Sequence, residues 1–135
     1  RAHEAGTLQL GDPAVKMTEQ AGLQIPPGKS FFEFQCPASV TQSWHEITVF
    51  GQILHMHANG DQMYLQIKNS SGVVKRPNSV EYFDFGWQDP TLNEPFKIKP
   101  GDELTTRCYF NNIQGKNISF GLGSDEEMCI DFIFY

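Results

Sequence analysis

The stretch ITVFGQILHMHANGD, residues 47–61, decides the fold. Most of its first eight residues are apolar, β-branched or aromatic, and such side chains pack well on the pleated surface of a sheet. The stretch therefore predicts a β-strand over residues 47–54. It closes on Asn59-Gly60-Asp61, a sequence typical of a tight turn, so we expect the strand to feed a β-hairpin.

Two histidines, His55 and His57, stand at the end of this strand. Alternate residues of a strand point to one face, so the two side chains should project together, with Cα atoms roughly 6 to 7 Å apart. Two such imidazoles can hold one metal ion between them. Two ligands do not close a metal site, and His-x-His also occurs in strands that bind no metal. A third ligand has to come from His3, from His45 or from residues 124–132.

Other segments repeat the period-2 alternation of half-buried strands, and none shows a convincing 3.6-residue period. Proline and glycine mark turns between them, most clearly at residues 25–29 and 99–102. These features predict an all-β fold, an antiparallel β-sandwich with at most one short helix. The expected strands are residues 8–10, 31–35, 47–54, 62–68, 80–87, 104–110 and 128–135, with 95–98 leading into the second turn.

Size and composition fit one domain, residues 1–135. The 135 residues are 39% hydrophobic and include 11 Phe, enough to bury a core. A net charge of -6 without a Lys/Arg cluster argues against a nucleic-acid partner. No apolar run approaches the roughly 18 to 20 residues that cross a bilayer, so we expect no membrane span.

Three cysteines, Cys36, Cys108 and Cys129, leave two interpretations open. A secreted protein would form one disulfide and pair the third cysteine elsewhere, whereas a cytosolic protein would keep three thiols. The triplets Asn69-Ser70-Ser71 and Asn117-Ile118-Ser119 match the acceptor pattern for N-glycosylation and favour a secreted glycoprotein.

Several motifs, spread nearly from end to end, together resemble the second half of the copper type II, ascorbate-dependent monooxygenases. They are RAHEAG (1–6), LQLG (8–11), IPPG (25–28), Cys36, VF (49–50), HMH (55–57), PGD (100–102), Cys108 and EEMC (126–129).

The resemblance implies a jelly-roll-like β domain that binds one copper ion through His55, His57 and Met128. A soft thioether favours Cu(I) over zinc, which agrees with this ligand set. By alternation alone, Met128 would instead be a core residue in line with Ile130, Phe132 and Phe134. The resemblance further implies oxygen activation at the copper, hydroxylation of a small-molecule C–H bond, ascorbate as external reductant, and a secreted or secretory-lumen location.

The same resemblance pairs Cys108 with Cys129. It gives Cys36 a partner beyond the position equivalent to Tyr135, so we expect Cys36 to be free in this chain.

Two departures from the family pattern bear on function. The family's other copper is held by three histidines of a preceding domain, and only His3 and His45 remain here outside the site, so the isolated chain should hydroxylate poorly. Peptide-amidating members read a peptide carboxylate with Arg, Asn and Tyr, and this chain has Ile53, Ile130 and Phe132 at those positions. None of the three can pair with a carboxylate, which disfavours peptide amidation.

Two other functions remain open on the sequence. The chain could be a non-catalytic copper-binding or interaction module of the same fold, or a plain β-sandwich adhesion domain with a chance His-x-His.

Overall fold

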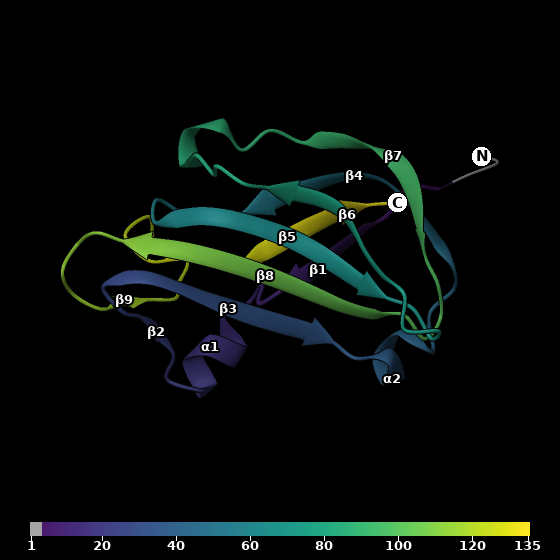
Figure 1. Ribbon diagram of the computed structural model, residues 1–135, viewed down its shortest axis with the longest axis horizontal. Coiled ribbons are helices and arrows are strands. Elements are labelled where there is room, and N and C mark those ends of the chain that lie inside the picture. The colour runs from purple at the N-terminus through teal and green to yellow at the C-terminus, as the bar shows by residue number, and fades with distance from the viewer. Residues whose placement is uncertain (1–3) are drawn as a thin grey trace.

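The computed structural model, which describes residues 4–135, contains two four-stranded antiparallel sheets that face each other (Figure 1). A third sheet has two short strands. The arrangement confirms the predicted all-β sandwich. In spatial order, the first sheet is β1 (Thr7–Gly11), β10 (Ile130–Phe134), β4 (Ile47–His55) and β7 (Thr91–Ile98); the second is β3 (Gly28–Cys36), β8 (Glu103–Asn112), β5 (Gly60–Lys68) and β6 (Val74–Val80); the small sheet is β2 (Gln24–Ile25) and β9 (Ile118–Ser119).

Helices are short. The described chain has two α-helices, α1 (Lys16–Gln20) and α2 (Ala38–Thr41), and one 3-10 helix, η1 (Phe85–Trp87). The expectation of at most one short helix was therefore wrong. No helix in residues 4–135 is long and apolar enough to cross a membrane.

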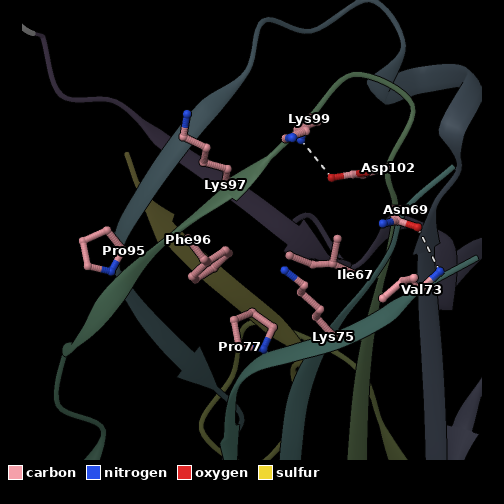
Figure 2. Close-up of a pocket in the computed structure, with 10 residues that line it drawn as sticks. All are labelled: Ile67, Asn69, Val73, Lys75, Pro77, Pro95, Phe96, Lys97, Lys99 and Asp102. Atoms are coloured by element: carbon pink, nitrogen blue, oxygen red, sulfur yellow. Dashed lines mark hydrogen bonds between the residues drawn. The ribbon is translucent and has the colours of Figure 1, made fainter. Parts of the chain in front are cut away.

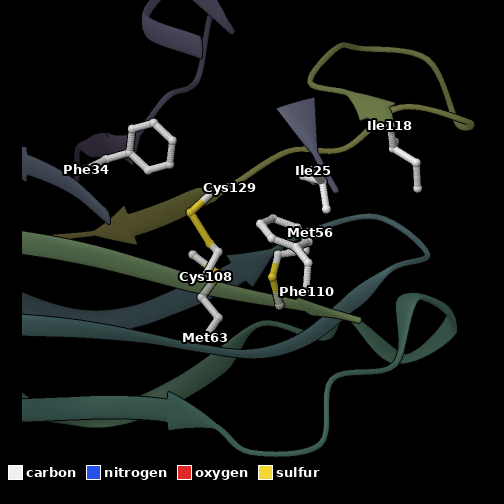
Figure 3. Close-up of a cluster of buried hydrophobic side chains, with 8 residues drawn as sticks. All are labelled: Ile25, Phe34, Met56, Met63, Cys108, Phe110, Ile118 and Cys129. Carbon is white, nitrogen blue, oxygen red and sulfur yellow. A yellow bond between two sulfur atoms is a disulfide. The ribbon is translucent and has the colours of Figure 1, made fainter. Parts of the chain in front are cut away.

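The core fills the space between the two large sheets in two clusters. One cluster lies around the disulfide between Cys108 of β8 and Cys129, which directly precedes β10 (Figure 3). The pairing is the one that the resemblance implies, and Cys36 is free. Because β8 and β10 belong to different sheets, the bridge ties the two sheets together. The first cluster is Ile25, Phe34, Met56, Met63, Cys108, Phe110, Ile118 and Cys129; the second is Leu10, Val49, Leu65, Ile67, Ile98, Leu104 and Ile133.

The last strand presents two different faces. Cys129 and Ile133 belong to the core clusters, so the odd-numbered residues face the sandwich interior. Neither cluster includes Met128, which is half-buried, and the ring of Phe132 contacts His55. Met128 precedes β10 and belongs to neither core cluster, so it is not the core residue that alternation alone predicts.

The hairpin expected at Asn59-Gly60-Asp61 is wrong. Strands β4 and β5 lie in different sheets, so the turn carries the chain across the sandwich. A tight type I′ hairpin needs positive φ at both central residues, and neither Asn59 nor Gly60 has it. Gly60 serves close packing instead, because a Cβ there would lie 2.8 Å from Met56 Cβ and from the Phe83 ring.

The strand expected over residues 80–87 is also wrong. Strand β6 ends at Val80, and residues 81–90 form a loop that contains η1. The Asp84 carboxylate accepts the N–H of Gly86 at 2.8 Å and caps that 3-10 turn, so the alternating aromatics do not form a ladder.

Two strands were not predicted in full because each contains a proline, which argues against a strand in a sequence pattern. Strand β6 contains Pro77 and strand β7 contains Pro95, but both strands are sheet edges, where a missing N–H is tolerated. The pairing register shifts between Leu65 and Ile67 opposite β6 and between Val49 and Gly51 opposite β7.

Candidate metal centre

The two histidines lie together at the end of β4. Their ring centroids are 5.2 Å apart and the ring planes meet at 84°. His57 is buried and His55 is half-buried. Burial lowers the pKa of His55, and the nearby His57 lowers it further, while a hydrogen bond to Gln88 opposes the shift. Burial and the nearby His57 both favour the neutral ring of His55, which is the form that binds a metal.

Hydrogen bonds at Nδ1 fix the tautomer of both rings. Nδ1 of His55 lies 2.6 Å from Oε1 of Gln88, and Nδ1 of His57 lies 2.8 Å from the backbone carbonyl of Glu126. The Gln88 amide is oriented by its Nε2, which donates to the carbonyl of Phe85 at 2.9 Å. Because carbonyl oxygens only accept, both Nδ1 atoms donate, and the lone pair of each ring is on Nε2. Metal-ligating histidines show this arrangement.

Glu127 joins the histidine segment to the segment before β10. Its side chain is fully buried and accepts three hydrogen bonds: from the backbone N–H of His57 (2.9 Å), the backbone N–H of Asn59 (2.6 Å) and Nδ2 of Asn59 (2.9 Å). A buried carboxylate needs such donors to compensate for lost hydration. Glu127, which directly precedes Met128, therefore ties its own segment of chain to the turn after His57.

Met128 is carried by a segment fixed on both sides. Glu127 precedes it and the disulfide-bonded Cys129 follows it. Two residues later, Ile130 pairs directly with His55 across the sheet. The chain is thus anchored to the histidine strand immediately before and after Met128.

His45, another candidate third ligand, is not brought to the pair. His45 lies ten residues before His55, beyond the opposite end of β4, where it lines a separate pocket with Leu8 and Tyr135. Along a strand that separation is on the order of 30 Å. His3 lies outside the described residues. Within residues 4–135 there is no group of three His, Cys, Asp or Glu side chains able to hold a metal.

One phenylalanine ring lies beside each histidine ring. The ring of Phe132 lies 5.9 Å from that of His55, and the ring of Phe85 lies 5.6 Å from that of His57. Ile53 pairs with Phe132 across the sheet. Trp87, in the same loop as Phe85, is 79% exposed.

Sequence reasoning missed Gln88, Phe85 and the role of Glu127. Gln88 and Phe85 both lie in the loop of residues 81–90, where a strand was predicted up to Trp87, and no local pattern connects them to the histidines. Glu127 carried a usable signal, because an acidic residue beside a strand of the core is buried only when donors surround it.

Comparison with known proteins identifies the family. The family model for the copper type II ascorbate-dependent monooxygenase C-terminal domain matches residues 3–135. Tyramine beta-hydroxylase of Caenorhabditis briggsae is 26% identical over the whole chain, and dopamine beta-hydroxylase of Canis lupus familiaris is 29% identical over the whole chain. The putative DBH-like monooxygenase protein 2 of Homo sapiens is 32% identical over 82% of the chain. The chain spans 22 to 24% of the length of these relatives. It is not an unrelated sandwich domain: the chain belongs to the copper type II ascorbate-dependent monooxygenases, as a C-terminal domain of that family.

Proposed function

We propose that residues 1–135 form one domain that holds a single, oxygen-activating copper ion through His55, His57 and Met128. The observation that carries the proposal is the paired Nδ1 hydrogen bonding, which leaves a lone pair on Nε2 of each ring, with the ring centroids 5.2 Å apart. Two imidazoles and a thioether suit Cu(I) and leave a coordination position open. Copper bound there would supply redox chemistry toward dioxygen for hydroxylation of a substrate C–H bond.

The protein's own part is to hold the ligands in place, and burial lowers the pKa of His55, which favours its neutral ring. Gln88 and the Glu126 carbonyl orient the rings, and such outer partners raise metal affinity by roughly 10- to 100-fold. Glu127 fixes the backbone on which His57 stands relative to the segment of Met128.

The surroundings favour an apolar part of the substrate at this site. The rings of Phe132 and Phe85 lie beside His55 and His57, and Ile53 is the cross-strand partner of Phe132. None of these three side chains carries a charge. An aromatic or aliphatic small molecule would therefore place its C–H bond here, and peptide amidation is disfavoured because no side chain among Ile53, Ile130 and Phe132 can pair with a carboxylate.

Electrons would come from outside the chain. We infer a preceding copper-bearing domain, with ascorbate as the external reductant, because the family is ascorbate-dependent and the chain spans about a quarter of its relatives. A secretory location is supported by the disulfide between Cys108 and Cys129, which persists in oxidising compartments.

The test is a Cu(I) titration against a chromophoric chelator. The chain should bind one Cu(I), His57→Ala should lose most of that affinity, and His45→Ala should match the unmodified chain. Retention of full affinity by His57→Ala would overturn the proposed site.

A second measurement separates catalysis from simple copper binding. When the chain is joined to the preceding domain of a relative, an oxygen- and ascorbate-dependent hydroxylation of that relative's substrate supports the catalytic proposal. Copper binding without turnover in that assembly would favour the alternative, a non-catalytic copper-binding or interaction module.

A further inference from the structure

A groove of about 410 Å³ opens between β6 and β7, the neighbouring edge strands of the two sheets (Figure 2). Its volume lies in the range of small-ligand sites. Ile67, Phe96 and Pro77 provide an apolar lining, and Val73 at the margin is 52% exposed. Such a surface gains stability when something covers it.

One side of this groove is formed by Asn69, at the turn after β5. Its Oδ1 accepts the backbone N–H of Ser71 at 3.0 Å and that of Val73 at 2.8 Å. These two bonds fix the side chain, and Figure 2 shows Oδ1 directed to Val73 and Nδ2 directed to the groove. Nδ2 donates to no protein group within residues 4–135.

Asn69 is also the first residue of an Asn-Ser-Ser acceptor triplet. The second triplet differs, since Nδ2 of Asn117 is engaged by Oε1 of Gln24 at 3.0 Å on an exposed surface away from the groove. Only at Asn69 do an acceptor triplet, a free amide nitrogen and an adjacent apolar groove coincide.

We propose that Asn69 carries an N-linked glycan whose first sugar covers the groove beside Phe96. In the transfer, Nδ2 forms a bond to the anomeric carbon of a lipid-diphosphate-linked oligosaccharide. The bond from that carbon to the diphosphate oxygen breaks, the diphosphate leaves with the electron pair, and the amide proton passes to a base. The product keeps the side-chain carbonyl, so Oδ1 still accepts from Ser71 and Val73.

The groove suits a sugar ring. The Phe96 ring and the prolines offer apolar surface for the C–H face of a pyranose, and the figure shows Lys75 extended toward Phe96. Lys75 has no carboxylate within 4 Å among the described residues, so its ammonium is available to sugar oxygens. Lys97 differs, because it pairs with Glu46.

The proposal rests on the secretory location proposed above, and site mapping tests it. The full chain is secreted from eukaryotic cells and its glycans are released enzymatically in ¹⁸O-water, which marks each formerly glycosylated Asn as labelled Asp. We expect labelled Asn69. Ser71→Ala should abolish that label while keeping the turn, because Ser71 contributes only its backbone N–H. Ser70→Ala, at the free middle position of the triplet, is the matched control and should keep it.

Covering of the groove is measured by binding of an apolar fluorescent dye. Ser71→Ala should raise dye fluorescence several-fold over Ser70→Ala, and adding Phe96→Ser should remove the increase. An unlabelled Asn69, with or without labelled Asn117, overturns the modification, and equal dye binding overturns the covering. A Cu(I) titration on the same samples reports independently on the metal site, so failure of one proposal is distinguishable from failure of the other.

Discussion

The carboxylate of Glu127 accepts the backbone N–H of His57 at 2.9 Å although 70 positions separate the two residues in sequence. The same carboxylate holds Asn59, two residues further on. One buried acidic side chain therefore sets the position of the end of β4 relative to the segment before β10. This hydrogen bond joins the proposed ligand His57 directly to the residue that precedes the proposed ligand Met128.

Substitution of Glu127 by Gln should loosen both segments. Gln keeps the shape but replaces one acceptor oxygen with a donor that faces other donors. We expect a loss of about 1 to 3 kcal/mol in the free energy of unfolding and weaker Cu(I) binding. Urea denaturation and chelator competition measure the two effects. Glu19→Gln on exposed α1 is the control, and equal behaviour of the two variants would contradict the anchoring role.

Gln88 should tune copper affinity through His55. Gln88→Met removes the acceptor for Nδ1 and should lower Cu(I) affinity by roughly 10- to 100-fold. Gln88→Glu keeps an acceptor for Nδ1 while losing the donor to Phe85, so it should retain most of the affinity. Chelator competition on the two variants decides the matter, and equal losses would show that the bond to His55 is irrelevant.

The period-2 pattern was sufficient to predict the sandwich, because side chains of half-buried strands alternate between core and solvent. It failed where another local interaction was stronger. Asp84 caps a 3-10 turn within the alternating aromatic run, and at Asn59-Gly60 the chain passes to the other sheet where Gly60 packs closely on Met56. Strand β6 was missed because the tolerance of Pro77 depends on an edge position that only the topology defines.

The candidate site was predictable to a similar degree. His55 and His57 could be placed on one face because they are close in sequence. Gln88 could not be connected to His55, nor Glu127 to His57, because the two pairs are 33 and 70 positions apart in sequence. Their contacts depend on how the loops return to the strand.

Asp131 should make stability depend on pH. It is fully buried, Gln52 Nε2 donates to its Oδ2 at 2.7 Å, and burial raises its pKa to about 7 against the opposing effect of that hydrogen bond. The folded state thus holds a proton that the unfolded state releases above pH ~4. The free energy of unfolding should therefore fall by on the order of 4 kcal/mol as pH rises from about 4 to about 7. Above pH ~7 it should level off.

The measurement is chemical denaturation of the copper-free chain at several pH values, compared with Asp131→Asn. The substitution removes the titrating group, so the difference in unfolding free energy between the two proteins should change across this range. Parallel curves would show that Asp131 is ionised in the folded chain.

The disulfide should support both the fold and the site. Its cysteines are 21 positions apart, and opening a loop of that size costs about 3 kcal/mol in the chain-entropy account. The double variant Cys108→Ala/Cys129→Ala should lose that stability and bind Cu(I) more weakly, because Cys129 adjoins Met128. Thermal denaturation and chelator competition measure these losses, with Cys36→Ala as the control. Unchanged Cu(I) affinity in the double variant would separate the bridge from the metal site.

The isolated chain should bind copper yet hydroxylate poorly. Hydroxylation needs a second electron, and no group of three His, Cys, Asp or Glu side chains within residues 4–135 offers a further copper site to supply it. Product formation by the copper-loaded chain with ascorbate and dioxygen should stay near that of free copper. Robust turnover by these 135 residues alone would contradict the need for a preceding domain.

The most direct test of the metal site is copper K-edge X-ray absorption of the chain loaded with one equivalent of Cu(I). The account predicts imidazole nitrogen scatterers together with one sulfur scatterer, and loss of the sulfur signal alone in Met128→Ala. A spectrum without sulfur in the unmodified chain, or one unchanged by Met128→Ala, would contradict the ligand set of His55, His57 and Met128.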